Sequence, residues 1–417
     1  MPTRIRPLPR RLAVPWIWFA LVHLWVAIAG LWMPNLPTGD VVLVYEPWSE
    51  QALAGSGIVG VTSEWVYPQL ALAPMILARA FIWLGNYTLA WAAFATLCDA
   101  VGFWFLLGRG TSRGRKLAAG FWLVCQLALG PVGMYRLDAI TVPMVIIALC
   151  WLVTRPTVAG ALLAAAVWIK VWPAAVLAAA FAVLRRRWAV VTGAIITTAL
   201  VVGVVLIGGG AKYLIGFVSE QSDRGLQIEA PVSTIYMWGA ALKVDGWWVY
   251  YDQHILTFQV TGSGIDTVIA LMTPLMVIAL AAILVLGFLQ AARGAHYRSL
   301  LPPLALALVL GFIVFNKVGS PQYQTWLIAP VVLWLIVDRR RAIRPALAVV
   351  WVLLVTQIIY PLTYTYVMAP TIGAVILLTA RNLALVGILW WMVVRLVRVP
   401  TGVRALRAAR VTVSFST

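Results

Sequence analysis

The feature that most limits what this chain can fold into is a series of apolar runs, each about as long as a membrane crossing. The first run covers residues 12–33 and follows the basic segment MPTRIRPLPRR. A bilayer core of about 30 Å takes roughly 20 apolar helical residues, because backbone polar groups in lipid must be satisfied within the segment. No small-residue cleavage site follows the run, as one would in a signal peptide. We therefore expect a retained first span and an all-α polytopic membrane protein.

Composition and charge agree with this class. Apolar residues make up 63% of the chain and charged residues only 11%, unlike a soluble domain. The net charge of +18 could suggest a nucleic-acid partner. However, the basic residues lie in short tracts between apolar runs, which is the pattern of cytoplasmic loops. We expect membrane lipids as partners, and no nucleic acid.

Counting the runs against the basic tracts predicts a single integral membrane domain, 1–417, with about twelve spans and both termini cytoplasmic. A first external loop then covers 34–87, a second covers 210–266, and a basic cytoplasmic tail covers 395–417. The expected spans lie near 12–33, 88–108, 117–135, 138–154, 157–170, 171–184, 189–209, 267–289, 300–316, 324–337, 345–363 and 371–394.

The apolar helix at 68–84 leaves two arrangements open. We place it along the outer interface, within the first external loop. In the rival arrangement it crosses the membrane, and 157–184 forms one long helix, which also gives about twelve spans. That arrangement exports the basic tract at 109–116 and is disfavoured by the positive-inside bias.

Carboxylates are rare, with 13 Asp and Glu in 417 residues, and nearly all fall on the external side of this topology. Three of them lie in PNLPTGDVVLVYEPWSE, at 34–50. Asp40 follows Pro37, Thr38 and Gly39, so it is either a turn or helix-cap residue or a general base facing water. Glu46 and Glu50 are four residues apart, as on a solvated helix face, and Glu46 is also a candidate for the site.

Basic residues at the outer ends of spans form a second group of candidates. Arg136 opens one span together with Asp138, Lys170 closes another, and Lys317 ends a third. Charges in such positions are costly unless they are paired or face water, so these residues either form a pocket for a lipid-borne phosphate or play structural parts. The structural alternatives are a local Arg136–Asp138 ion pair and a snorkelling Lys170.

Several stretches, taken in order, resemble the GT-C glycosyltransferases, and most closely glycosyltransferase family 87. They are GDVVLVYEPW, EWVYPQLALAP, YRLDAITV, AAAVWIKVWPAAVL, SDRGLQIEAPVST and KVGSPQYQTWL, within about 13–365. The resemblance implies a GT-C-type bundle that transfers mannose, or arabinofuranose, from a polyprenyl-phosphate donor to a glycolipid or cell-envelope glycan. It places the active site on the external face of the plasma membrane.

The resemblance also implies roles for individual residues. Asp40 matches the proposed general base. Arg136, Asp138 and Lys170 match positions near the donor phosphate. Positions of the later blocks correspond to Arg224, Glu229, Gln322 and Tyr323. Donor-phosphate candidates are therefore Lys170, Arg136, Arg224 and Lys317, and the further substrate-binding candidates are Asp138, Glu46, Tyr67, Glu229, His254, Gln322 and Tyr323.

The chemistry of such a transfer is compatible with one carboxylate. In a single displacement with inversion, one base takes the proton of the attacking hydroxyl, and Lys or Arg stabilises the leaving phosphate. The sequence requires no cofactor beyond the lipid-linked donor and predicts no metal site, with dependence on a divalent metal left open.

A transporter or lipid-glycan flippase is the alternative function. It would place ionisable residues near the bilayer midplane and show internal repeats. Only Asp99 and Arg381 lie deep in predicted spans, and we expect a buried ion pair between them.

Overall fold

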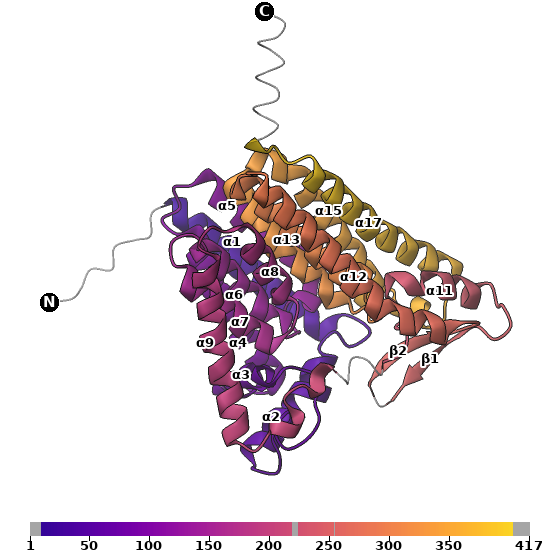
Figure 1. Cartoon of the computed structure of the whole chain (residues 1–417). Helices are drawn as coiled ribbons and strands as arrows, with labels where there is room; N and C mark the ends of the chain where they lie inside the picture. The colour runs from indigo at the N-terminus through magenta and orange to yellow at the C-terminus, as the bar shows by residue number, and fades with distance from the viewer. Residues whose placement is uncertain (1–9, 219–223, 254, 403–417) are drawn as a thin grey trace, which may run out of the picture.

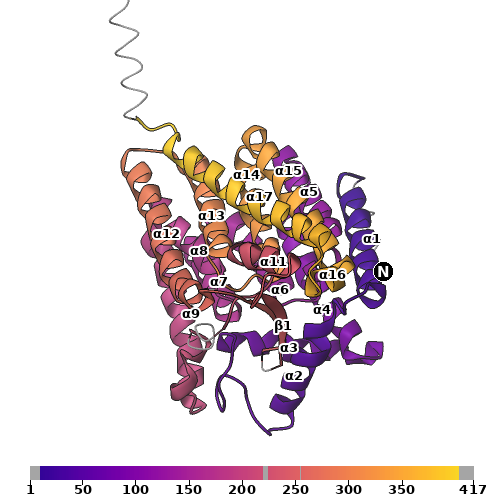
Figure 2. The same cartoon turned by 90° about the vertical axis from the view of Figure 1, so that its right-hand side faces the viewer.

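The computed structural model describes residues 10–218, 224–253 and 255–402, and it is predominantly helical (Figures 1 and 2). Among these residues, eight helices are long and apolar enough to cross a membrane. They are α1 (Arg10–Trp32), α4 (Tyr87–Leu107), α5 (Arg113–Leu129), α9 (Arg187–Ile207), α12 (Ile265–Ala292), α13 (Tyr297–Val314), α15 (Arg339–Gln357) and α17 (Ile372–Val397). The chain is therefore a helical, polytopic membrane protein.

Besides the broken stretch at Gln69–Leu84, four shorter apolar helices of the described residues lie between the long ones. They are α6 (Asp138–Trp151), α7 (Pro156–Ile169), α8 (Pro173–Val183) and α14 (Ile328–Val337). The expected total of about twelve spans requires these four to cross as well, and it stays a prediction. The long helix of the rival arrangement does not form, because α7 ends at Ile169 and Pro173 opens α8 as a separate helix.

The first predicted external loop, 34–87, folds into short helical pieces. A π-helical turn, η1 (Val41–Tyr45), leads into α2 (Glu46–Leu53). The apolar stretch that we placed at the interface is broken into η2 (Gln69–Ala71), α3 (Leu72–Ala78) and η3 (Arg79–Leu84).

The second predicted external loop contains a β-hairpin, which the sequence analysis did not anticipate. Strands β1 (Trp248–Asp252) and β2 (Thr257–Thr261) pair antiparallel, with Trp248 opposite Thr261. The helical elements of this region are η5 (Ala211–Tyr213), η6 (Pro231–Ser233) and α11 (Thr234–Ala241). The remaining short elements of the chain are η4 (Gly130–Gly133), η7 (Pro321–Leu327), η8 (Ile358–Leu362) and α16 (Tyr364–Met368).

The two loop regions lie at the same end of the bundle. The Gln69 side chain donates a hydrogen bond to the Tyr213 carbonyl at 2.9 Å, which ties the first region to the second. Both views place α2 and the hairpin at this end and the C-terminal end of α17 at the other. The predicted grouping of the two large loops on one side agrees with this arrangement.

Close helix packing in the bundle depends on small residues. An added Cβ on Gly160 of α7 would meet the Val190 carbonyl of α9, and one on Gly193 of α9 would meet the Thr157 carbonyl of α7. Small residues let backbones approach closely where the surrounding lipid supplies no hydrophobic drive between helices. These two glycines therefore fix the contact between α7 and α9.

The expected buried pair between Asp99 and Arg381 does not form. In α4, Asp99 accepts hydrogen bonds from the Gln126 amide at 2.6 Å and contacts the His23 ring at 3.0 Å. In α17, Arg381 donates to the Glu229 carbonyl at 2.8 Å. The prediction was wrong because each charge finds its own partner in an adjoining segment, α1 and α5 for Asp99 and the second loop region for Arg381.

Candidate functional site

A cavity of about 740 Å³ opens where the two loop regions meet. Five parts of the chain line it: 35–67, Arg136, 224–258, 320–322 and 360–368. Many of the lining side chains are aromatic, including Trp48, Trp65, Tyr251, Tyr360 and Tyr364. The site residues predicted from sequence that also line it are Asp40, Tyr67, Arg136, Arg224, Glu229 and Gln322.

The local backbone presents Asp40 to this cavity. Asp40 precedes the π-helical turn η1, and its side chain makes no capping hydrogen bond. Just upstream, Asn35 and Leu36 have positive φ angles of 59° and 49°. Non-glycine residues rarely adopt this conformation, and both π-turns and such backbone outliers are frequent at functional sites. The helix-cap interpretation is therefore wrong, and the carboxylate is available for other contacts.

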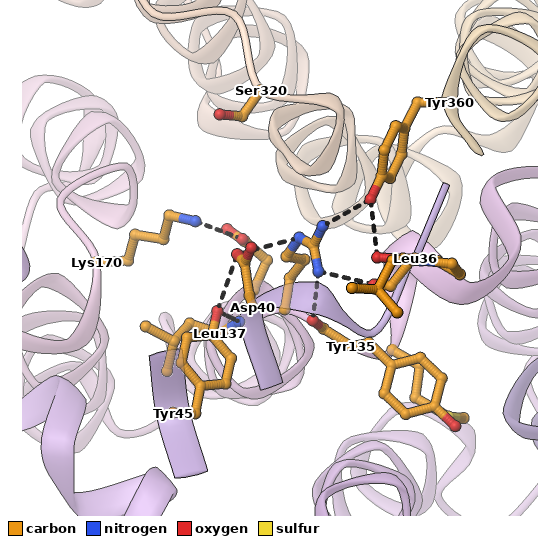
Figure 3. A network of polar contacts seen from close by, with 12 residues as sticks. Leu36, Asp40, Tyr45, Tyr135, Leu137, Lys170, Ser320 and Tyr360 are labelled. Atoms are coloured by element: carbon orange, nitrogen blue, oxygen red, sulfur yellow. Dashed lines mark hydrogen bonds and ion pairs between the residues drawn. The ribbon is translucent and has the colours of Figure 1, made fainter. Parts of the chain in front are cut away.

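Arg136 holds Asp40 in place. Its Nε lies 3.2 Å from Asp40 Oδ2 (Figure 3). Its remaining nitrogens donate to the Pro37 carbonyl at 2.8 Å, the Tyr135 carbonyl at 3.0 Å and the Tyr360 hydroxyl at 3.3 Å. The Asp40 side chain is 31% exposed, whereas that of Arg136 is 6% exposed. Burial by itself lowers the pKa of Arg136, but Asp40 raises it and the net shift is upward.

Two tyrosines complete the surroundings of Asp40. The Tyr45 hydroxyl accepts a hydrogen bond from the Leu137 amide at 3.2 Å and lies 3.5 Å from Asp40 Oδ2. Burial raises the pKa of Tyr45 well above its usual value, so its hydroxyl keeps its proton. Figure 3 shows Tyr45 and Tyr360 reaching the carboxylate region from separate segments. Tyr360 was not predicted as a site residue from the sequence.

Asp138 and Lys170 form a second ion pair beside the first. Asp138 is fully buried, and its two oxygens lie 2.5 Å from Lys170 Nζ and 2.5 Å from Trp326 Nε1. Local pairing of Arg136 with Asp138, one of our structural alternatives, is therefore wrong, because each contacts a residue distant in sequence.

Lys170 is not among the residues that line the cavity. Its ammonium group lies 6.0 Å from the ring centre of Tyr67, which does line the cavity, and 5.6 Å from that of Tyr323. Lys170 thus stands behind the cavity wall with its charge balanced by Asp138. Snorkelling toward water does not describe it, because it is buried.

Glu229 is one of three carboxylates on the cavity, together with Asp40 and Glu64. It is 1% exposed and lies 3.8 Å from Arg381 Nη2. Burial raises the pKa of Glu229 to about 7, against the opposing effects of Arg381 and a hydrogen bond with Tyr364. A buried carboxyl with this pKa titrates near neutral pH.

Arg224 brings a further positive charge to the cavity. Its Nε is buried and has no hydrogen-bond partner among the described residues. An arginine with a free donor on a cavity wall is a natural contact for a phosphate oxygen.

Two further candidates, Lys317 and Tyr323, lie outside the lining. Lys317 is buried, and its carbonyl accepts from the Gln227 amide at 3.1 Å. Tyr323 stacks on Trp326, with ring centres 4.2 Å apart. His254 lies outside the described residues.

Glu46 and Glu50 fit the solvated helix face that was their alternative interpretation. Arg79 contacts Glu50 at 3.0 Å and donates to the Glu46 carbonyl at 3.1 Å. Glu50 is 61% exposed at its side chain. Both glutamates are absent from the cavity lining.

Within the described ranges, no three His, Cys, Asp or Glu side chains are grouped as a metal site would require. Comparison of the chain with protein-family models, with curated proteins and with solved structures finds no match. The function is therefore argued from the cavity itself.

Proposed function

We propose that this chain is an inverting glycosyltransferase. It takes a sugar, with mannose the first candidate, from a polyprenyl phosphate and transfers it to a lipid-linked or cell-envelope glycan on the external face of the plasma membrane. One observation carries the proposal. In a membrane protein poor in carboxylates, the partly exposed Asp40 is held by the buried Arg136 on a cavity large enough for a sugar donor.

Asp40 is the general base in this reaction. The acceptor hydroxyl oxygen forms a bond to the anomeric carbon as the bond from that carbon to the phosphate oxygen breaks. The phosphate leaves with the bonding electron pair, and the hydroxyl proton passes to Asp40. Arg136 makes three hydrogen bonds besides this ion pair, so it fixes the carboxylate in one position.

The leaving phosphate needs positive charge, which Arg224 and Arg136 supply on the cavity wall. Lys170 supports the site from behind Tyr67 instead of facing the donor. The aromatic side chains of Trp48 and Trp65 give the cavity flat apolar surfaces, which suit stacking on a sugar or contact with the first units of a prenyl chain.

The test uses purified full-length protein, a panel of polyprenyl-phosphate sugars that includes mannose and arabinofuranose, and envelope lipid extract. Mass spectrometry of the products should show an added sugar for one donor. Asp40→Asn should abolish the product, whereas Asp266→Asn, at the start of α12 and away from the cavity, should keep it. Full transfer by a folded Asp40→Asn protein would remove Asp40 as the base.

One observation favours the transporter or flippase. The His23–Asp99 contact lies within α1 and α4, and ionisable residues inside spans often mark ion pathways. Proteoliposomes separate the two functions. Uptake or flipping that depends on Asp99, without sugar transfer, would support transport.

A further inference from the structure

A second polar cavity lies where α17 ends. Figures 1 and 2 show this end of α17 on the opposite side of the bundle from α2 and the hairpin. The volume of the cavity is about 300 Å³, and it is bounded by the start of α13, the start of α15 and the end of α17. None of the described residues that line it is acidic. The lining residues are Ser299, Arg341, Trp391, Val394, Arg395, Arg398, Val399 and Pro400.

Two of the three arginines are already held in position. Arg341 contacts Asp338 at 3.4 Å, and the guanidinium of Arg395 lies 4.6 Å from the ring centre of Trp334. Arg398 follows Arg395 by three residues, so the two lie on the same side of the helix end. Three positive groups therefore converge on one cavity with a single carboxylate beside them.

Helix ends add to this positive potential. Ser299 lies in the first turn of α13 and Arg341 in the first turn of α15, so the N-terminal ends of two long helices border the cavity. Such ends carry partial positive charge, which favours anions. Each end also has a side-chain cap that takes one N–H group: Asp338 accepts from the Arg341 amide and His296 from the Arg298 amide. The C-terminal end of α17 has the opposite sign, but it carries Arg395 and Arg398.

We propose that this cavity binds a phosphate group, presented by the headgroup of an anionic phospholipid or as free phosphate. The planar fork of arginine matches phosphate oxygens, and Ser299 offers a hydroxyl donor. Trp391 and Val394 give the cavity an apolar side where the glycerol part of a lipid would rest. The basic tracts 338–344 and 395–417 were assigned to the cytoplasmic side, where anionic headgroups attract such residues.

The test titrates the purified full-length protein in mild detergent with phosphatidylglycerol, with phosphatidylcholine and with inorganic phosphate, and follows complexes by native mass spectrometry. Preference for phosphatidylglycerol with weak phosphate binding assigns a lipid headgroup. Phosphate binding without any preference between the two lipids assigns free phosphate. Binding of neither phosphatidylglycerol nor phosphate overturns the proposal.

Matched variants separate a built site from a diffuse charge effect. Arg341→Gln/Arg395→Gln/Arg398→Gln should weaken binding roughly 100-fold, since each lost hydrogen-bonded contact between an arginine and the phosphate weakens binding about fivefold. The control removes the same charge from exposed positions of the same tract that do not line the cavity, as Arg339→Gln/Arg340→Gln/Arg344→Gln.

A single change guards against loss of folding. Arg398 is exposed, so Arg398→Gln should leave the fold intact and still weaken binding about fivefold through the loss of its phosphate contact. Equal weakening by the control triple variant, or no effect of Arg398→Gln, would overturn the assignment to this cavity.

Discussion

The pair of Asp138 and Lys170 gives the sharpest prediction about what holds the candidate site together. Asp138 is fully buried and Lys170 is 11% exposed at its side chain, with 2.5 Å between the charged atoms. Removing one partner of a buried pair leaves an uncompensated charge and costs about 3–5 kcal/mol. Asp138→Asn and Lys170→Met should each lower the free energy of unfolding by that amount.

The double variant should be far less damaged than either single one. Asp138→Asn/Lys170→Met removes both charges, and replacing a buried ion pair by neutral groups is often close to neutral. An asparagine oxygen can still accept the hydrogen bond of Trp326. We expect the double variant to lie within about 2 kcal/mol of the wild type.

Asp40→Asn is the matched comparison. It breaks the neighbouring ion pair, but Asp40 is partly exposed and Arg136 keeps three other hydrogen bonds. Its cost in stability should be smaller, about 1 kcal/mol. Reversible unfolding in mixed detergent micelles, followed by circular dichroism, gives the free energy of unfolding of the wild type and of the four variants. A double variant no more stable than the single ones would refute the reasoning.

Glu229→Gln should flatten the pH dependence of stability. The pKa of Glu229 rises from 4.5 to about 7 on folding, so the folded protein binds a proton that the unfolded chain has lost. The free energy of unfolding of the wild type should therefore fall by about 3 kcal/mol as the pH rises from 4.5 to 7. Unfolding titrations at several pH values in this range measure the effect. Equal slopes of the free energy of unfolding against pH in the wild type and in Glu229→Gln would contradict the prediction. Gly193→Ala should lower the free energy of unfolding by about 1–3 kcal/mol, because the added methyl group overpacks the contact with α7. Gly203→Ala places its methyl group in open space and should leave the stability unchanged. Unfolding titrations compare these two variants. Tyr360→Phe should slow sugar transfer about tenfold in the product assay, because Arg136 loses a hydrogen bond. An unchanged rate would show that this hydrogen bond does not support the reaction.

The helical bundle was predictable because lipid permits few alternatives. Apolar runs without internal partners must form helices, and the break between α7 and α8 follows from Pro173. The hairpin at 248–261 was not predictable in the same way. Its strands mix aromatic and apolar residues with the polar Asp252, Thr257, Gln259 and Thr261, and strand pairing is decided by packing at the loop face.

The candidate site was predictable in its residues more than in its contacts. Asp40, Arg136 and Glu229 were predicted because a charged side chain near the end of a span is costly unless it is paired or faces water. Their partners are separated by long stretches of chain, 96 residues between Asp40 and Arg136 and 152 between Glu229 and Arg381. No local pattern reports such pairings, so the pairing of Lys170 with Asp138 emerged only from the fold.

The loop before Asp40 is tied to a segment made much later. The Asn35 amide donates to the Pro361 carbonyl at 2.7 Å across 326 residues, and Thr365 donates to the Asn35 side chain at 3.1 Å. A ribosome adds about 5–20 residues per second, so Asn35 is synthesised on the order of tens of seconds before Pro361 and Thr365. A nascent chain that stops short of residue 360 contains Asp40 and Arg136 but lacks the hydrogen bonds that Tyr360, Pro361 and Thr365 make to this loop. The loop before Asp40 can therefore take its final form only after residues 360–365 have been synthesised.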